Sequence, residues 1–372
     1  MTASTPPAPD RPAGPIDGLW AVVPAGGAGT RLWPLSRSSS PKFLRDLTGT
    51  GRSLLQGTHD RLAPLVQDRF LVVTGRAHRD AVAEQLPDVD GAAIVAEPSA
   101  RDSMAAIGLA AAMLERRDPD AVMGSFAADH VIADPAGFGD AVRVATAAAR
   151  DGWLVTIGID PTFPSAAFGY IHLGDDLEGH AGAHAVVEFV EKPSVDVAER
   201  YLATGRYRWN AGMFVVRPTV LLDLLAEGDP DFAAALRAIA ADPDTLEDAW
   251  AGLPKIALDH AVAEPAAAAG RVAVVPASFG WDDIGDFDSL ATLLEAPDPS
   301  SVTVLGDDAL VRAIAATGLV VPGGGKVVAV VGLDDVVVVD TPDALLVTTR
   351  ARAQDVKAIV AALKESGRTD LT

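Results

Sequence analysis

Short apolar runs alternate with helix-like segments along most of this 372-residue chain, and this alternation constrains the fold more than any other feature. The runs have strand length and are dense in Val, Leu and Ile: Leu19–Pro24, Phe70–Thr74, Ala92–Val95, Ala121–Phe126 and Trp153–Ile159. Amphipathic segments between them begin near Ser53, Ser103 and Ala136. The alternation predicts the α/β class, with right-handed βαβ units and a Rossmann-like, mostly parallel sheet flanked by helices. Ligands of such sheets bind at the carboxyl ends of the strands.

The pattern changes after about residue 298. From Val327 to Val347, short β-branched runs are separated by four-residue turns. This spacing predicts a small β-rich domain, either a few coils of a β-solenoid or a β-meander. Residues 351–366 then predict an amphipathic helix. We therefore expect a large domain over residues 19–297 and a small C-terminal domain over residues 298–372.

The first eighteen residues are rich in Pro and Ala and lack a basic region followed by an apolar one. We expect residues 1–18 to form a disordered tail and not a secretory signal. Charged residues interrupt every apolar stretch before it reaches the roughly 20 residues of a membrane span, so no membrane association is expected. The chain has no cysteine, which excludes disulfides and thiolate chemistry and fits a cytoplasmic location.

The formal net charge of −21 argues against nucleic acid as a partner, because a phosphate backbone is bound through many Lys and Arg side chains. A small anion could still be bound where a few cations gather. The chain has only six lysines against 24 arginines, and two of the lysines, Lys42 and Lys192, stand beside turn residues.

The first strand leads directly into a glycine-rich stretch, "PAGGAGTRLWPL", which matches neither the P-loop nor the dinucleotide fingerprint. Glycines 26, 27 and 29 lack a Cβ atom, so backbone N–H groups could approach an anion closely. Arg31 can bind phosphate oxygens bidentately, and Pro41 would hold the chain extended before Lys42. The alternative is a glycine turn followed by a solvent-facing arginine.

Two acidic positions could bind a hard cation such as Mg2+. Asp129 follows an apolar run in "SFAADHVI", where it could equally cap a helix or form a turn. The segment "FGWDDIGDF" offers adjacent carboxylates, Asp282 and Asp283, and the residues alone do not distinguish between them. A solvated acidic turn is the alternative there. We interpret His130 as structural.

Two further motifs carry groups suited to a sugar phosphate. In "FVEKPS", Glu191 and Lys192 precede a proline, which predicts extended geometry for Lys192; an exposed ion pair is the alternative. In "WNAGMFVV", the amide of Asn210 could donate to and accept from adjacent hydroxyls, whereas Trp209 could be core packing.

Together these motifs resemble the sugar-1-phosphate nucleotidyltransferase family, from about Leu19 to Leu363. The family signature Gly-Gly-x-Gly-Thr-Arg-Leu-x-Pro-Leu, followed by Pro-Lys, is met at Gly26, Gly27, Gly29, Thr30, Arg31, Leu32, Pro34, Leu35, Pro41 and Lys42. Trp33 and the "LSR" after Pro34 resemble the mannose-1-phosphate guanylyltransferase branch. The resemblance implies a GT-A-like nucleotidyltransferase fold in which this loop wraps the triphosphate of the nucleotide.

The resemblance also implies roles for individual residues. Asp129 and Asp283 would be the metal ligands, and Arg31, Lys42 and Lys192 would be catalytic. Nucleotide-binding positions would be Ala25, Gly26, Gly27, Gly29, Thr30, Arg31, Lys42, Glu97, Pro98, Arg101, Ser103 and Asp129. Sugar-phosphate-binding positions would be Gly169, Tyr170, Glu191, Lys192, Asn210 and Gly212.

Two segments depart from the family pattern. In "EPSARDSMA", Asp102 and Ser103 replace Asn and Thr in a stretch associated with the nucleotide base. In "FPSAAFGYI", Gly169 and Tyr170 are kept but the usual Glu-Thr-Gly is absent. The choice of base and of sugar therefore stays open at this point.

The resemblance implies an enzyme that transfers GMP from GTP to α-D-mannose 1-phosphate, giving GDP-mannose and pyrophosphate by Mg2+-assisted in-line attack. Two alternatives are another hexose-1-phosphate nucleotidyltransferase and a non-catalytic sugar-nucleotide-binding regulator. Expected partners are GTP and mannose 1-phosphate, with a homodimer as the expected assembly. Longer family members add an isomerase domain, and we expect no isomerase activity from the sequence given.

Overall fold

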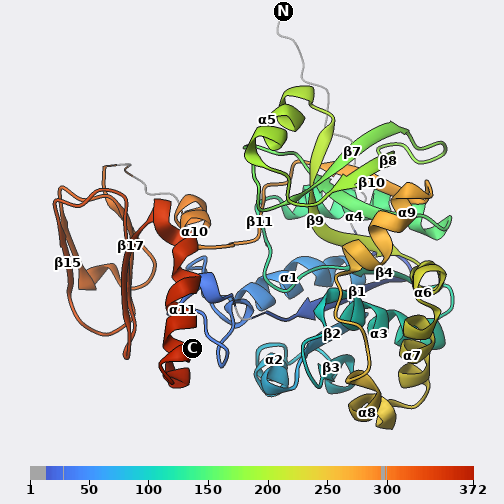
Figure 1. Cartoon of the computed structure of the whole chain (residues 1–372), viewed down its shortest axis with the longest axis horizontal. Coiled ribbons are helices and arrows are strands. Elements are labelled where there is room, and N and C mark those ends of the chain that lie inside the picture. Colours follow the sequence, from blue (N-terminus) through green and yellow to red (C-terminus); the bar gives the residue numbers. More distant parts are fainter. Residues whose placement is uncertain (1–13, 28, 295–297, 299) are drawn as a thin grey trace, which may run out of the picture.

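The computed structural model describes residues 14–27, 29–294, 298 and 300–372, and its larger lobe is built on a 9-stranded sheet of order β3-β2-β1-β4-β9-β6-β10-β8-β7 (Figure 1). These strands are β1 (Leu19–Ala25), β2 (Phe70–Gly75), β3 (Ile94–Glu97), β4 (Val122–Ser125), β6 (Leu154–Ile159), β7 (Gly169–Asp176), β8 (His184–Val190), β9 (Tyr207–Val216) and β10 (Val272–Ala277). Within this sheet only β8 and β9 run against the other strands. The predicted α/β class is confirmed.

Helices cover both faces of the sheet, and one of them begins at the cap that the sequence indicates, Ser53. Ser53 and Gln56 form a capping box at the start of α1, and Asp134 caps α4. The helices of the larger lobe are α1 (Leu54–Val66), α2 (Arg79–Gln85), α3 (Asp102–Arg117), α4 (Pro135–Arg150), α5 (Val195–Thr204), α6 (Pro218–Gly228), α7 (Pro230–Ala241), α8 (Leu246–Trp250), α9 (Glu264–Ala268) and α10 (Phe287–Leu294). Within the described ranges, no helix has the length and apolarity needed to cross a bilayer.

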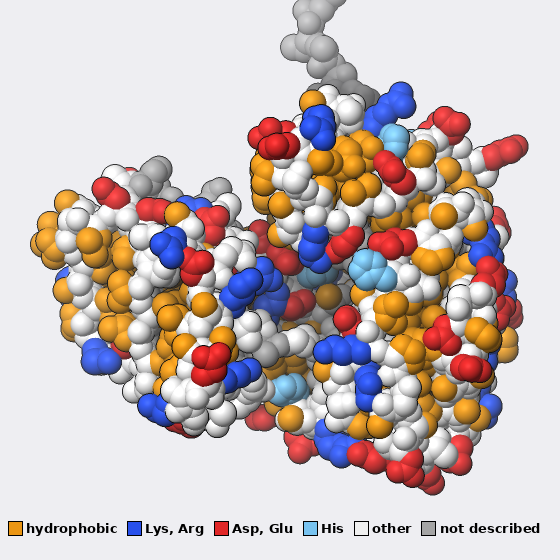
Figure 2. All heavy atoms as spheres, viewed as in Figure 1, with side chains coloured by type: hydrophobic (Ala, Val, Ile, Leu, Met, Phe, Trp, Pro, Cys, Tyr) orange, Lys and Arg blue, Asp and Glu red, His pale blue; other side chains and the backbone are white. Residues whose placement is uncertain are grey.

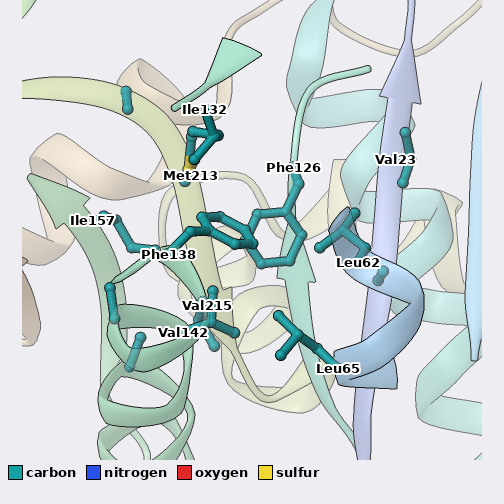
Figure 3. Packing of buried hydrophobic residues seen from close by; sticks show 14 of the residues in the cluster. Val23, Leu62, Leu65, Phe126, Ile132, Phe138, Val142, Ile157, Met213 and Val215 are labelled. Atoms are coloured by element: carbon teal, nitrogen blue, oxygen red, sulfur yellow. The ribbon is translucent and has the colours of Figure 1, made fainter. Parts of the chain in front are cut away.

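Strand β1 shows why the strands read as continuous apolar runs. Its alternate side chains enter two separate cores: Ala21 and Val23 pack with α1 and α4, whereas Trp20 and Val22 pack with α3, α6 and α7. Both faces of the strand are therefore buried. Its sequence is apolar throughout and does not alternate with polar residues, as that of a half-exposed strand would. Figure 3 shows the first of these cores, where the rings of Phe126 and Phe138 meet edge to face with centroids 5.4 Å apart.

The smaller lobe is a short β-solenoid. Strands β12, β14 and β16 pair in parallel in one sheet and β13 with β15 in another, so successive strands alternate between two faces. A meander would pair successive strands antiparallel, and of these pairs only β16 with β17 does so. The bounds are β12 (Val302–Val304), β13 (Val311–Ile314), β14 (Gly318–Pro322), β15 (Val328–Val331), β16 (Val336–Asp340) and β17 (Leu345–Thr349). The predicted β-solenoid-like domain is confirmed.

The two lobes share a hydrophobic core. Leu32, Trp33 and Leu35 of the glycine-rich loop pack with side chains from β16 and from α11 (Val356–Glu365). Figure 1 shows α11 lying between the solenoid and the larger lobe. The segment expected to be one helix, 351–366, instead begins with a 3-10 turn, Arg350–Asp355, before α11. The glycine-rich loop is thus packed on the smaller lobe.

The N-terminal segment and the domain boundary differ in part from the prediction or lie outside the described residues. Of the predicted tail, residues 1–13 lie outside the described residues. Residues 14–18 pack on the larger lobe, because Ile16 is buried and its N–H donates to the carbonyl of Leu65 at 2.7 Å. The packed chain therefore begins before the predicted start at Leu19. The predicted boundary at residues 297 and 298 falls beside residues 295–297, which are also outside the described ranges.

Candidate functional site

The carboxyl ends of β1, β3 and β4 lie at one edge of the sheet because these strands run parallel. Beyond the end of β4, the N–H of Ala128 donates to the carbonyl of Pro24 at 3.1 Å, which keeps this segment beside β1. Asp129 is therefore held next to the glycine-rich loop. Figure 2 shows a hollow between the two lobes in which Lys, Arg, Asp, Glu and His side chains gather.

The glycine-rich loop leaves β1 and turns at Gly29, whose φ of 59° is left-handed. A Cβ atom there would stand 2.9 Å from the hydroxyl oxygen of Ser36 and 3.1 Å from Cβ of Lys42. Gly29 thus allows both the turn and the close approach of Lys42. Gly26 and Gly27 are exposed, and Thr30 and Arg31 begin a 3-10 turn that buries Leu32.

Lys42 joins the two predicted metal-binding segments. Its side chain is only 12% exposed, and Nζ lies 2.9 Å from Oδ2 of Asp129. Nζ also donates to the backbone carbonyl of Asp283. A buried ammonium needs such partners, because desolvation disfavours an unpaired charge. Residues separated by more than two hundred positions thus meet at one cation.

The adjacent carboxylates Asp282 and Asp283 have different surroundings. Oδ1 of Asp282 accepts the N–H of Ile284 at 2.6 Å, and burial raises the pKa of Asp282 to about 6. Burial also raises the pKa of Asp283; Lys42 and Arg31 oppose this rise, and Asp129 reinforces it. Lys42 also lowers the pKa of Asp282, whereas Arg31 and Asp129 act on Asp283. Asp282 therefore closes the turn, and Asp283 lies nearer to the charged groups of the loop.

Ile284 stores backbone strain beside this group. Its φ of 43° is left-handed, which is unfavourable for a β-branched residue. Such strain persists only where neighbouring contacts over-determine the backbone, and it clusters at functional sites.

The donor set around Lys42 fits Mg2+. Asp129 and Asp283 supply two carboxylates, and across the described ranges no group of three or more His, Cys, Asp or Glu side chains is suited to a metal. Mg2+ is commonly held by one or two carboxylates, with substrate phosphates and water completing its octahedron. In a site of this kind, a phosphate group of the substrate would complete the coordination of the metal ion.

The predicted base-binding segment lies at the end of β3. Glu97 is buried, and burial raises its pKa to about 7. The guanidinium of Arg101 donates to the carbonyls of Leu253 at 3.1 Å and Ala251 at 2.5 Å. The Ser103 hydroxyl accepts the N–H of Leu258 at 2.9 Å. The Arg101 and Ser103 side chains therefore hold the segment that precedes α9. Pro98 directly follows Glu97 in the sequence.

Most of the predicted sugar-phosphate positions meet where β7 pairs with β9. Gly169 is in register with Asn210, and a Cβ atom on Gly169 would lie 2.6 Å from Oε2 of Glu191. The Asn210 amide is used in both directions: its oxygen accepts the N–H of Gly212 at 3.0 Å, and its nitrogen donates to Oδ1 of Asp259 at 2.5 Å. The three motifs therefore form one cluster.

Two predicted residues are placed differently from the expectation. Lys192 has a φ of 44° instead of extended geometry, its side chain is 62% exposed, and it pairs with Glu191. The bias exerted by the following proline is overridden by the turn between β8 and α5. Tyr170 is fully buried, and its hydroxyl donates to the carbonyl of Ser165 at 3.0 Å, so its side chain packs in the core and does not face a ligand.

Sequence reasoning missed two polar residues at this site. Asp259 starts a π-helical turn, Asp259–Ala263, and burial raises its pKa, with nearby Glu191 adding to the effect. Gln354 of the smaller lobe accepts a hydrogen bond from Nη1 of Arg31 at 3.2 Å. For Asp259 the only signal was a carboxylate within the apolar run "IALDHAV"; for Gln354 the sequence carries none.

The chain matches two known families. The family described as nucleotidyl transferase matches residues 20–298, and the MannoseP isomerase/GMP-like beta-helix domain matches residues 306–363. The second match agrees with the observed solenoid.

Individual proteins show the same relationship. The xanthan biosynthesis protein XanB of Xanthomonas campestris is 41% identical over 360 residues, which cover 94% of this chain and 74% of that protein. Mannose-1-phosphate guanylyltransferase ManC of Salmonella typhimurium is 39% identical over 363 residues, covering 94% and 74%. A solved structure described as mannose-1-phosphate geranyltransferase from Thermus thermophilus has a TM-score of 0.83 and 34% identity, and covers 93% of this chain and 99% of that chain. The predicted family resemblance is confirmed: the chain belongs to the nucleotidyl transferase family, as an enzyme of the mannose-1-phosphate guanylyltransferase type.

Proposed function

We propose that the chain transfers GMP from GTP to α-D-mannose 1-phosphate. A phosphate oxygen of the sugar phosphate attacks the α-phosphorus of GTP and forms the new P–O bond, and the bond from that phosphorus to the β-phosphate bridging oxygen breaks. The products are GDP-mannose and pyrophosphate. The activity for which the ManC relative is named supports this choice of base and sugar.

The observation that carries the proposal is the meeting of Asp129, Asp283 and Arg31 around Lys42 beside the exposed backbone of Gly26 and Gly27. Phosphoryl-type transfer depends mainly on positioning and on stabilisation of charge, and the attacking phosphate is already ionised near neutral pH. No protein nucleophile or general base is therefore needed. Arg31, Lys42 and the loop N–H groups would stabilise the charge that gathers on pyrophosphate.

Asp129 and Asp283 are the residues that would hold Mg2+, which when bound neutralises phosphate charge as a Lewis acid. Asn210, Glu191 and the backbone at Gly169 would bind sugar hydroxyls. Lys192 would bind the sugar phosphate. Its exposed ammonium is paired only with a neighbouring carboxylate among the contacts described for it, so a dianionic phosphate could compete for it.

A substrate panel tests the proposal. Pyrophosphate release is measured for GTP, ATP, UTP and dTTP, each with mannose 1-phosphate, glucose 1-phosphate and galactose 1-phosphate, with Mg2+ or with EDTA. We expect the highest kcat/KM for GTP with mannose 1-phosphate and no turnover in EDTA. A preference for another pair would identify a different hexose-1-phosphate nucleotidyltransferase. Binding of GDP-mannose without turnover of any pair would identify a non-catalytic regulator.

Location and assembly belong to the same proposal. The cysteine-free composition and the proposed use of GTP are consistent with a cytoplasmic enzyme. A homodimer remains our prediction, and sedimentation of the purified chain would test it by giving the mass of two chains.

A further inference from the structure

The smaller lobe contributes a side chain to the glycine-rich loop. Gln354 lies in the 3-10 turn Arg350–Asp355, and its amide oxygen accepts from Nη1 of Arg31 at 3.2 Å. Its amide nitrogen donates to Oδ2 of Asp286. The two bonds join elements of the chain that lie far apart in sequence.

Asp286 and the turn that carries Gln354 are both held by further hydrogen bonds. Asp286 is only 6% exposed, and its Oδ1 accepts the N–H groups of Asp288 at 2.8 Å and Ser289 at 3.1 Å, which caps α10. In the same 3-10 turn, Nε of Arg350 donates to Asp288 at 2.8 Å. Gln354 therefore projects from a turn that is fixed on α10.

The chemistry of the bridge fixes its direction. A carboxylate can only accept and a guanidinium can only donate, so the Gln354 nitrogen must face Asp286 and its oxygen must face Arg31. A direct Arg31–Asp286 ion pair would neutralise the guanidinium. The neutral amide instead holds Arg31 in place while leaving its charge available to an anion.

We infer that Gln354 is a positioning residue that orients Arg31 toward the nucleotide triphosphate, so that the smaller lobe takes part in nucleotide binding. This inference rests on the proposed role of Arg31 in phosphate binding. A long Arg side chain loses rotamer entropy when it binds a phosphate, and prior restraint by Gln354 lowers that cost. Removing the restraint should weaken binding of the triphosphate without altering the sugar site.

The test uses the full chain with Gln354→Met, which keeps the length and packing of the side chain but removes both hydrogen bonds. We expect the Kd for GTP, measured by calorimetry without sugar phosphate, to rise about tenfold. The KM for pyrophosphate in the reverse reaction should rise similarly, and the KM for mannose 1-phosphate should stay unchanged. Arg352→Ala is the matched control, because Arg352 lies in the same turn and pairs with Asp355.

A double-mutant cycle distinguishes positioning from a general structural role. If Gln354 acts through Arg31, Gln354→Met should have no further effect on the Kd for GTP in an Arg31→Ala background. An equal loss in both backgrounds, or an equal rise in KM for both substrates, would overturn the inference while leaving the proposed function intact. If Gln354→Met does not fold, Gln354→Ala and Gln354→Glu enter the same cycle.

The cycle also separates this inference from the proposed function. If the wild-type chain binds another nucleoside triphosphate more tightly than GTP, the cycle is run with that nucleotide, since the triphosphate is common to all. If Gln354→Met then had no further effect in the Arg31→Ala background, the inference would be supported even though the proposed specificity for GTP had failed. A wild-type chain that binds no nucleoside triphosphate would overturn both.

Discussion

At the scale of single residues, neighbouring side chains of the same type have different tasks. Asp282 accepts the N–H of Ile284, and Lys42 lowers the pKa of Asp282 as well as that of Asp283, but only Asp283 is also affected by Arg31 and Asp129. Two consecutive carboxylates of one acidic segment thus have different neighbours. The spacing of the two aspartates along the sequence does not indicate which of them faces the charged groups of the loop.

Asp283→Asn should therefore lower kcat by about 10²-fold or more and raise the Mg2+ concentration needed for half-maximal turnover. Asp282→Asn is the matched control, since an amide oxygen can still accept the N–H of Ile284. It should retain activity within a few-fold. Both effects are measured by Mg2+ titration of pyrophosphate release. A larger shift in Mg2+ dependence for Asp282→Asn would reverse the assignment.

Glu97 provides a pH-dependent signature. Burial raises its pKa to about 7 from the ordinary 4.5, so between these values the folded chain holds a proton that the unfolded chain has released. The contribution of Glu97 to the free energy of unfolding therefore falls as the pH rises from about 5 to 8. Glu97→Gln cannot ionise, so it should become more stable than wild type with rising pH, by about 1–2 kcal/mol at pH 8. Thermal unfolding at a series of pH values measures this. A constant difference across the range would contradict it.

At the scale of elements, the first half of β9 and the π-helical turn Asp259–Ala263 form one support for the proposed sugar site. Asn210 is held through its nitrogen by Asp259 and through its oxygen by the N–H of Gly212. Glu264 lies just beyond the same turn and bonds only His260 among the contacts described for its side chain, at 3.0 Å.

Asp259→Ala should free the Asn210 amide and raise the KM for mannose 1-phosphate about tenfold, with little change in the KM for GTP. Asp259→Asn keeps an acceptor oxygen and should recover most of the loss. Glu264→Ala is the control and should leave both constants unchanged. Steady-state kinetics with each substrate varied in turn gives the values. A comparable rise in both KM values for Asp259→Ala would show that the turn supports the fold and not specifically this site.

The elements also show what the sequence could and could not predict. Buried strands such as β1 and β4 and the cap at Ser53 depend on local patterns, and their prediction is confirmed. The reversed strands β8 and β9 contain polar residues such as Glu188 and Asn210, and they are not among the apolar runs that the sequence indicates. Their direction depends on pairing with strands distant in the sequence, which a local pattern does not record. Asp259 and Gln354 act through partners 49 and 323 positions away, which only the folded chain brings together.

At the scale of the whole molecule, the two lobes are tied by one core at the glycine-rich loop. Strand β16 lies at the division: Val337 and Val339 enter the core shared with Leu32 and Trp33, whereas Val338 enters the interior of the solenoid. The loop is further held by Nε1 of Trp33, which donates to the carbonyl of Leu371 at 2.7 Å. Anchored on both lobes, the loop should not unfold separately from either.

Val339→Ala and Val338→Ala remove the same atoms from neighbouring positions of β16, and each should lower the free energy of unfolding by about 2 kcal/mol. Because the shared core supports the glycine-rich loop, only Val339→Ala should also raise the KM for GTP. Calorimetry should show a single unfolding transition for both variants, since the core at the contact between the lobes is made of side chains from both. Two separate transitions, or equal KM values in the two variants, would mean that the solenoid packs on the larger lobe without supporting the proposed nucleotide site.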